Sequence, residues 1–236
     1  MRRLARFVLR GGHRKVGAAG PLATRPKLII FDFDGTIADT FENGLEILNL
    51  LAGEFGYRPL LRSDLAKARD MRTRELMKFL NIPTTKMGKI SKRGTEELSK
   101  RIDLVQPLDG VPAALRTIRD AGFSMGIVTS NSCANVAAFL KNHDLEFFDF
   151  VRSASKLMGK GREIRAVLKD RNLPPGDILL VGDETRDIEA AQETGAHIAA
   201  VTWGYNSRRA LEGLQPDHIL NNPGELLDLL GTFPEK

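Results

Sequence analysis

The stretch FDFDGT (residues 31–36) closes a short apolar run at 28–33 and decides the fold. Its two aspartates, Asp32 and Asp34, stand at the end of a predicted strand, so both would lie at the carboxyl edge of a sheet. Open α/β sheets bind their ligands at that edge. Neighbouring carboxylates repel each other, and burying both requires a cation or a shared proton. Taken alone, the pattern fits an ordinary strand that ends in a polar turn equally well.

Beyond residue 27, short apolar runs alternate with helical stretches. The runs that we expect to form parallel strands cover 28–33, 123–129, 178–181 and 198–202, with weaker candidates at 148–152 and 218–220. The helical stretches between them cover 112–120, 133–142, 162–171 and 188–194. This alternation predicts an α/β fold in which helices cover both faces of a parallel sheet.

One stretch, 40–105, breaks this alternation because it has helical periodicity and no convincing strand. We expect a first helix with capping-box spacing between Asp39 and Glu42, and further helices at 73–80 and 86–105. The predicted domains are therefore a basic flexible extension (1–26), an α/β core (27–39 and 106–236) and a small all-helical cap (40–105) inserted after the first strand.

The composition excludes several classes of protein. Of the 236 residues 42% are hydrophobic and 28% are charged, which is typical of a globular chain and not of a disordered or fibrous one. No run approaches the roughly 18 apolar residues of a membrane span. The single cysteine, Cys133, cannot form an internal disulfide.

The positive charge is concentrated at the N-terminus. Residues 1–27 contain eight Lys/Arg and no acidic residue, whereas the rest of the chain holds 27 basic and 30 acidic residues, a net charge of −3. A solvated extension, an organelle-targeting peptide and an arm that binds nucleic acid or anionic membrane all remain open for this segment. We expect a cytoplasmic protein, or an organellar one if the segment is a transit peptide, and no nucleic-acid partner for the core.

A second polar strand end lies in GIVTSNS (126–132), where Thr129, Ser130 and Asn131 precede a predicted helix. A helix N-terminus offers unpaired N–H groups and a positive dipole, so an anion can bind there. Ordinary helix capping explains the same residue types.

A third polar strand end lies in ILLVGDETRD (178–187), where Asp183 ends the strand and Asp187 follows about one helical turn later. Oxygen ligands of this kind suit Mg²⁺, although acidic residues also favour the first turn of a helix. A lysine before this strand, Lys156 or Lys160, could offset the repulsion between carboxylates and a phosphate.

In this order, the DxDGT motif at 32–36, the Thr, the Lys and the GDxxxD motif at 182–187 resemble the haloacid dehalogenase-like (HAD) hydrolase superfamily. The closest likeness is to its phosphoglycolate phosphatase-like branch, over about residues 27–230. The resemblance implies a Rossmann-like core, a helical cap that closes over the site, and phosphatase activity through an aspartyl-phosphate.

The resemblance also implies roles for individual residues. Asp32 would be the nucleophile, and Asp34 would protonate the leaving alcohol and later activate water. The residues that would hold the phosphoryl group are Thr129, Ser130, Asn131 and Lys160. The ligands of the Mg²⁺ cofactor would be Asp32, the backbone carbonyl of Asp34, Asp183 and Asp187.

The expected substrate is a small phosphomonoester, either phosphoglycolate-like or a sugar phosphate. Arg72 and Arg74 of the cap, with Arg69 and Lys78 near them, could contact a substrate carboxylate or second phosphate, although a solvated helix face explains them as well. A phosphomutase on the same fold and a non-catalytic binding or regulatory protein are the alternatives. The sequence does not predict the oligomeric state.

Overall fold

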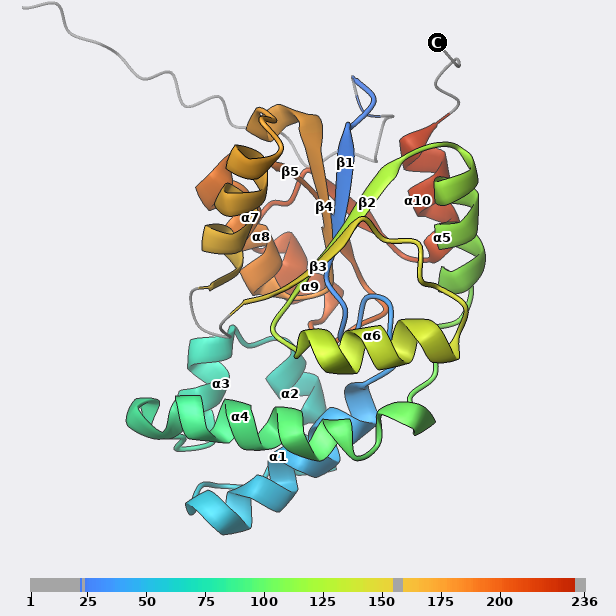
Figure 1. Cartoon of the computed structure of the whole chain (residues 1–236). Coiled ribbons are helices and arrows are strands. Elements are labelled where there is room, and N and C mark those ends of the chain that lie inside the picture. Colours follow the sequence, from blue (N-terminus) through green and yellow to red (C-terminus); the bar gives the residue numbers. More distant parts are fainter. Residues whose placement is uncertain (1–21, 23, 155–158, 232–236) are drawn as a thin grey trace, which may run out of the picture.

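The computed structural model describes residues 22, 24–154 and 159–231. Six strands form one parallel sheet in the order β3-β2-β1-β4-β5-β6 (Figure 1). The strands are β1 (Leu28–Phe31), β2 (Ser124–Thr129), β3 (Phe150–Ser153), β4 (Ile178–Gly182), β5 (His197–Val201) and β6 (His218–Leu220). The predicted α/β fold with a parallel sheet is confirmed, and both weak strand candidates belong to it.

Helices cover both faces of the sheet (Figure 1). One face carries α5 (Val111–Asp120), α6 (Cys133–Asn142) and α10 (Pro223–Leu230), and the other carries α7 (Gly159–Asp170), α8 (Thr185–Thr194) and α9 (Arg208–Glu212). Side chains of β1 alternate between the two faces, because successive residues of a strand point in opposite directions. Ile29 and Phe31 pack in one core, and Leu28 and Ile30 pack in the other.

The chain between β1 and α5 is helical, and we name residues 41–104 the helical insert. Its helices are α1 (Phe41–Phe55), α2 (Leu65–Arg69), α3 (Thr73–Phe79) and α4 (Met87–Ser99), joined in part by 3₁₀ turns at Arg62–Asp64, Thr84–Lys86 and Ile102–Leu104. The insert lies below the carboxyl edge of the sheet in Figure 1. Its buried apolar side chains belong to the same core as those of Ile29 and Phe31.

Two local predictions for the insert are wrong. The helix expected over 86–105 is α4, which ends at Ser99, and a separate 3₁₀ turn follows it. The capping box of Asp39 is absent, since α1 begins at Phe41 with Thr40 as its N-cap residue and no side-chain cap. Asp39 instead belongs to the segment that connects the core to the insert. Its N–H donates to Gln106 O at 2.9 Å, and its neighbour Ala38 forms a β-bridge with Pro107.

The predicted basic extension lies almost wholly outside the described residues, as does Lys156. Among the helices that the structure describes, none is long and apolar enough to cross a bilayer.

The strand order places a topological reversal beside β1. From β1 the chain builds β2 and β3 on one side, and it then crosses over to begin β4 on the other side. At such a reversal the connections leave the sheet in opposite directions, so a crevice opens at the carboxyl ends of the two strands. Phe31 of β1 pairs with Val181 of β4. Asp32, which follows β1, and Asp183, which follows β4, therefore both lie at this crevice.

Candidate active site

Three buried carboxylates meet at the reversal. Each of Asp32, Asp183 and Asp187 offers an oxygen within 4.8 Å of the others, and no more than 3% of any of the three residues is exposed. Asp32 Oδ1 accepts the N–H of Phe33 at 2.8 Å, while Asp32 Oδ2 is buried and accepts no hydrogen bond from the described part of the chain. Buried like charges repel unless a cation lies among them. The all-oxygen donor set fits a hard cation such as Mg²⁺.

Asp183 is fixed from two sides. Thr36 Oγ1 donates to its Oδ1 at 2.7 Å, and the N–H of Tyr205 donates to its Oδ2 at 2.7 Å. Burial raises the pKa of Asp183 well above its ordinary value, and the nearby charges of Glu184 and Asp32 raise it further.

Glycines make room for this carboxylate. A Cβ at Gly35 or Gly204 would lie 2.4 or 2.2 Å from Asp183 Oδ2, so a larger residue at either position would displace the carboxylate. Gly35 also has φ of +76°, a conformation that glycine adopts readily and other residues rarely do.

Of the lysines that the structure describes, Lys160 lies at the cluster. Its Nζ lies 2.9 Å from Asp32 Oδ2 and also contacts Asp187 Oδ1, with 11% of the side chain exposed. Burial lowers the pKa of Lys160, but the carboxylates of Asp187 and Asp32 outweigh this effect and raise the pKa above its usual value. Burial raises the pKa of Asp187 to about 6 even though Lys160 opposes the shift. One ammonium group therefore compensates the three carboxylates only in part.

Asp34 lies beside this cluster and is held by Asn131. The side-chain amide of Asn131 donates to Asp34 Oδ1 at 3.1 Å, and its carbonyl oxygen accepts from Ser132 N and from the Asn135 amide. Asn131 is almost fully buried, so its orientation is set by these partners. Asn131 therefore orients Asp34, in addition to the substrate contact that the sequence predicts for it.

The strand end after β2 has the predicted form. Thr129 is fully buried, and its Oγ1 accepts the N–H of Asn131 at 3.0 Å. Ser132 caps α6 by accepting the N–H of Asn135 at 3.1 Å. Ser130, between the strand and this cap, lines a cavity.

The cavity, about 280 Å³ in volume, joins the site to the interior of the helical insert. Its polar lining includes Asp34, Ser130, Asn131, Glu184 and Arg186, and most of the remaining lining is apolar and comes from α1 to α4. Asp34 thus faces the space in which a leaving group could lie.

The loop after β5 connects the insert to the cluster. The Arg69 guanidinium of the insert donates to Gly204 O at 2.7 Å and to Tyr205 O at 3.1 Å. The Asn206 amide donates in turn to Arg69 O and Met71 O. Since Tyr205 N also holds Asp183, the insert and the carboxylate cluster share one loop.

Arg186 was not among the predicted site residues. It lines the cavity, with 16% of its side chain exposed, and its Nη2 contacts Glu184 Oε1 and lies 3.9 Å from Asp32 Oδ2. Burial lowers its pKa, but the carboxylates of Glu184 and Asp32 raise it by more, so the pKa of Arg186 lies above its ordinary value. The only signal in the sequence is its place inside the GDxxxD motif.

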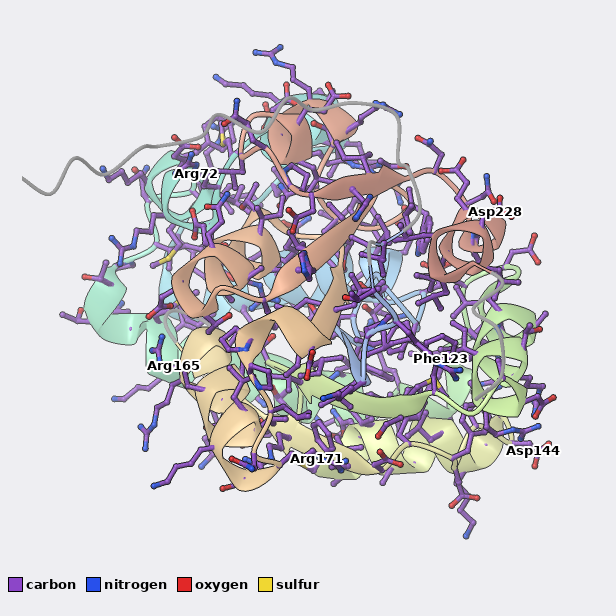
Figure 2. The ribbon with its side chains drawn as sticks, turned by 90° about the horizontal axis from the view of Figure 1, so that it is seen from above. Arg72, Phe123, Asp144, Arg165, Arg171 and Asp228 are labelled. Atoms are coloured by element: carbon purple, nitrogen blue, oxygen red, sulfur yellow. The ribbon has the colours of Figure 1, made fainter. Side chains whose placement is uncertain are left out.

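The structure does not place Arg72 and Arg74 at the cavity. Both are exposed, neither belongs to the lining, and Arg72 Nη1 lies 3.4 Å from Glu189 on α8. Figure 2 shows Arg72 at the outside of the molecule. The prediction that these two contact substrate is therefore not supported by this arrangement. Arg69, three residues earlier, is the basic residue of this group that lines the cavity.

Comparisons with known proteins agree with the fold. The family model of haloacid dehalogenase-like hydrolases matches residues 29–201. A phosphoglycolate phosphatase of Synechococcus elongatus is 34% identical over 84% of this chain and 94% of its own length, and the pyrophosphatase PpaX of Bacillus thuringiensis is 27% identical over 87% and 96%. A crystal structure of a predicted phosphatase from Clostridium acetobutylicum superposes with a TM-score of 0.74, at 22% identity over 87% of this chain and 98% of that one. The chain therefore belongs to the haloacid dehalogenase-like hydrolase family, as its motifs predicted.

Proposed function

We propose that this chain is a Mg²⁺-dependent phosphatase that hydrolyses a small phosphomonoester through a phosphorylated Asp32. One observation carries the proposal: Asp32, Asp183, Asp187 and Lys160 converge at the reversal of the sheet, and Asp34 lines the cavity. The phosphatase and pyrophosphatase names of the relatives support the same class of reaction.

In this proposal Asp32, Asp183 and the backbone carbonyl of Asp34 hold the Mg²⁺, with Asp187 assisting directly or through water. When bound, the ion would neutralise the cluster and polarise the phosphate oxygens. Thr36 and Tyr205 keep Asp183 oriented for this task through the hydrogen bonds described above.

The first step forms a bond between a carboxylate oxygen of Asp32 and phosphorus, while the bond from phosphorus to the leaving oxygen breaks. Asp34, oriented by Asn131, gives its proton to the leaving alcohol. Lys160 offsets the negative charge of Asp32, and the strand end from Thr129 to Asn131 would hold the phosphoryl oxygens at the start of α6.

The second step releases phosphate. Asp34, now ionised, takes a proton from water, and the water oxygen attacks phosphorus as its bond to Asp32 breaks. Asp32 returns as a carboxylate, and both catalytic groups regain their first protonation states. A carboxylate nucleophile thus divides the hydrolysis into two displacements at one site.

The helical insert would act as a cap over these steps. Its contact with the loop after β5, through Arg69, binds it to the core beside the cavity. A closed cap excludes water and strengthens electrostatic interactions inside.

The proposed domains are those that the sequence predicts: the extension, the core and the cap. The proposed location stays cytoplasmic, or organellar if the N-terminal segment is a transit peptide.

Filling the cavity should weaken binding of bulky esters. Gly94 of α4 lines it, and a Cβ there would make ordinary contacts of 3.8 Å with Ile47 and Leu51. We expect Gly94→Leu to raise KM for pyridoxal phosphate or p-nitrophenyl phosphate about tenfold, because the new side chain takes the space of the leaving group. Gly88→Leu is the matched control, since Gly88 lies exposed on the same helix with nothing near its Cβ. Equal KM values for the two variants would place the leaving group elsewhere.

A hydrolysis screen with Mg²⁺ tests the function itself. The compounds are phosphoglycolate, sugar phosphates, nucleoside monophosphates, pyridoxal phosphate and pyrophosphate, and the readout is released inorganic phosphate. We expect at least one phosphomonoester with kcat/KM above about 10⁴ M⁻¹s⁻¹. Transfer of phosphate within a sugar phosphate without release would indicate a mutase. Tight binding without turnover of any compound would indicate a binding or regulatory protein.

A further inference from the structure

We propose that Arg186 contacts the transferring phosphoryl group and balances, together with Lys160, the negative charge that develops on it during transfer. The inference rests on the proposed function and adds a residue that neither the sequence motifs nor the family likeness assigned. It concerns the guanidinium at the first turn of α8, which faces both the cavity and the predicted nucleophile.

Two cations lie near the predicted nucleophile, Asp32. Its Oδ1 is occupied by the N–H of Phe33, whereas its Oδ2 lies between two cations, Lys160 Nζ at 2.9 Å and Arg186 Nη2 at 3.9 Å. Reactive complexes bring the attacked atom to about 3–3.5 Å from the attacking oxygen. Phosphoryl oxygens of a substrate attacked by Oδ2 would then lie within hydrogen-bond reach of Arg186.

The contacts of the Arg186 guanidinium are a second, independent observation. An arginine that served only to neutralise Glu184 could grip both carboxylate oxygens with a fork of two nitrogens. Among the residues that the structure describes, the guanidinium makes its ionic contacts through Nη2, and Nε is buried without a hydrogen-bond partner. A buried donor that is left without an acceptor destabilises the folded state. The free protein thus holds Arg186 in an incompletely satisfied state, which a phosphoryl oxygen could complete after a small side-chain shift.

The charge balance of the site is a third observation. With Asp34 protonated for the first step, the formal charges of the described carboxylates and cations at the site sum to −2: Asp32, Asp183, Glu184 and Asp187 against Lys160 and Arg186. One Mg²⁺ would leave a net charge of zero, and the substrate adds a phosphate dianion. Lys160 is already shared between Asp32 and Asp187. The Arg186 guanidinium, which lies beside the nucleophile, can therefore stabilise the negative charge that builds up on the phosphoryl oxygens during transfer.

The test compares wild type with Arg186→Gln, Arg186→Lys and the control Arg165→Gln. Arg165 pairs with Glu193 at 2.9 Å on the solvent side of α7, and Figure 2 shows it at the outside of the molecule. For Arg186→Gln we expect kcat to fall about 10²–10³-fold with less than a tenfold change in KM, because the contact strengthens in the transition state. Arg186→Lys should recover part of kcat, and Arg165→Gln should match wild type.

A second readout separates contact with the phosphoryl group from structural damage. Inhibition by orthovanadate, whose trigonal bipyramidal adducts resemble the transition state, should weaken in Arg186→Gln by at least ten times more than inhibition by inorganic phosphate. The stabilisation by Mg²⁺ should stay as in wild type. Equal kcat for Arg186→Gln and Arg165→Gln, with an active wild type, would overturn this inference and leave the proposed function intact. An inactive wild type would overturn both.

Discussion

Asp32→Asn should lower kcat by about 10⁴-fold or more on every substrate that the protein hydrolyses, because an amide cannot replace the carboxylate as nucleophile. The substitution keeps the shape of the side chain and its acceptor for the N–H of Phe33. It also removes one of three mutually repelling carboxylates, so the fold should persist. Rate measurements on purified variants, with thermal unfolding as the check on folding, decide the matter.

The control for this prediction is Asp228→Asn. Asp228 is exposed on α10, at the periphery of the molecule in Figure 2, and has no part in the site. The Asp228→Asn substitution changes the net charge by the same amount as Asp32→Asn and should leave kcat unaltered. If Asp32→Asn kept more than about a tenth of wild-type kcat, a different group would have to attack phosphorus, and the proposed first step would be wrong.

Removal of the metal should also abolish most of the turnover. We expect EDTA to lower kcat by at least about 10³-fold and Mg²⁺ to restore it, because Lys160 and Arg186 cannot neutralise both the carboxylates and a bound phosphate. A true halide-displacing enzyme would be indifferent to EDTA. Turnover that survives exhaustive chelation would contradict the metal site.

Thermal unfolding gives a readout of the same site without activity. At a Mg²⁺ concentration 100 times Kd, binding should raise Tm by about 5–10 °C for a domain of this size. Asp183→Asn should lose this increase, since it removes a buried ligand while keeping an acceptor for Thr36 or Tyr205. Asp228→Asn again serves as the control and should retain the increase. A wild-type Tm that does not respond to Mg²⁺ would argue against the ion as the resident cofactor.

The carboxylate cluster could be anticipated from the sequence because its members are defined by local patterns. Asp32 and Asp183 each stand at the end of an apolar run that is expected to form a buried strand, and parallel strands bring their carboxyl ends to one edge. Asp187 follows Asp183 by one helical turn, which returns it to the same side. The structure brings all three together.

The contributions of Arg186 and Arg69 could not be anticipated in the same way. The direction of Arg186 depends on how the first turn of α8 meets the end of β4, and the pattern of the GDxxxD motif does not carry that information. Arg69 and Arg72 lie three residues apart in the helical insert, yet one lines the cavity and the other pairs with Glu189. Helical periodicity defines which faces are apolar, but it does not define how the insert is oriented on the sheet.

The capping box fails for a similar reason. The spacing of Asp39 and Glu42 is correct for a cap, but the chain at Asp39 is still bonded to Gln106 where it leaves the core. A nonlocal backbone pairing thus delays the start of α1. Local propensity is a weak guide wherever tertiary contacts compete for the same backbone groups.

The most direct test of a phosphorylated Asp32 is to trap it. Acid quench during turnover, followed by borohydride reduction, converts an acyl phosphate on aspartate into homoserine, and peptide mass spectrometry locates the change. Our account predicts homoserine at position 32 of the wild-type protein, dependent on Mg²⁺ and substrate, and none at position 34 or 183. Reduction at a different carboxylate, or none while phosphate is being released, would contradict it.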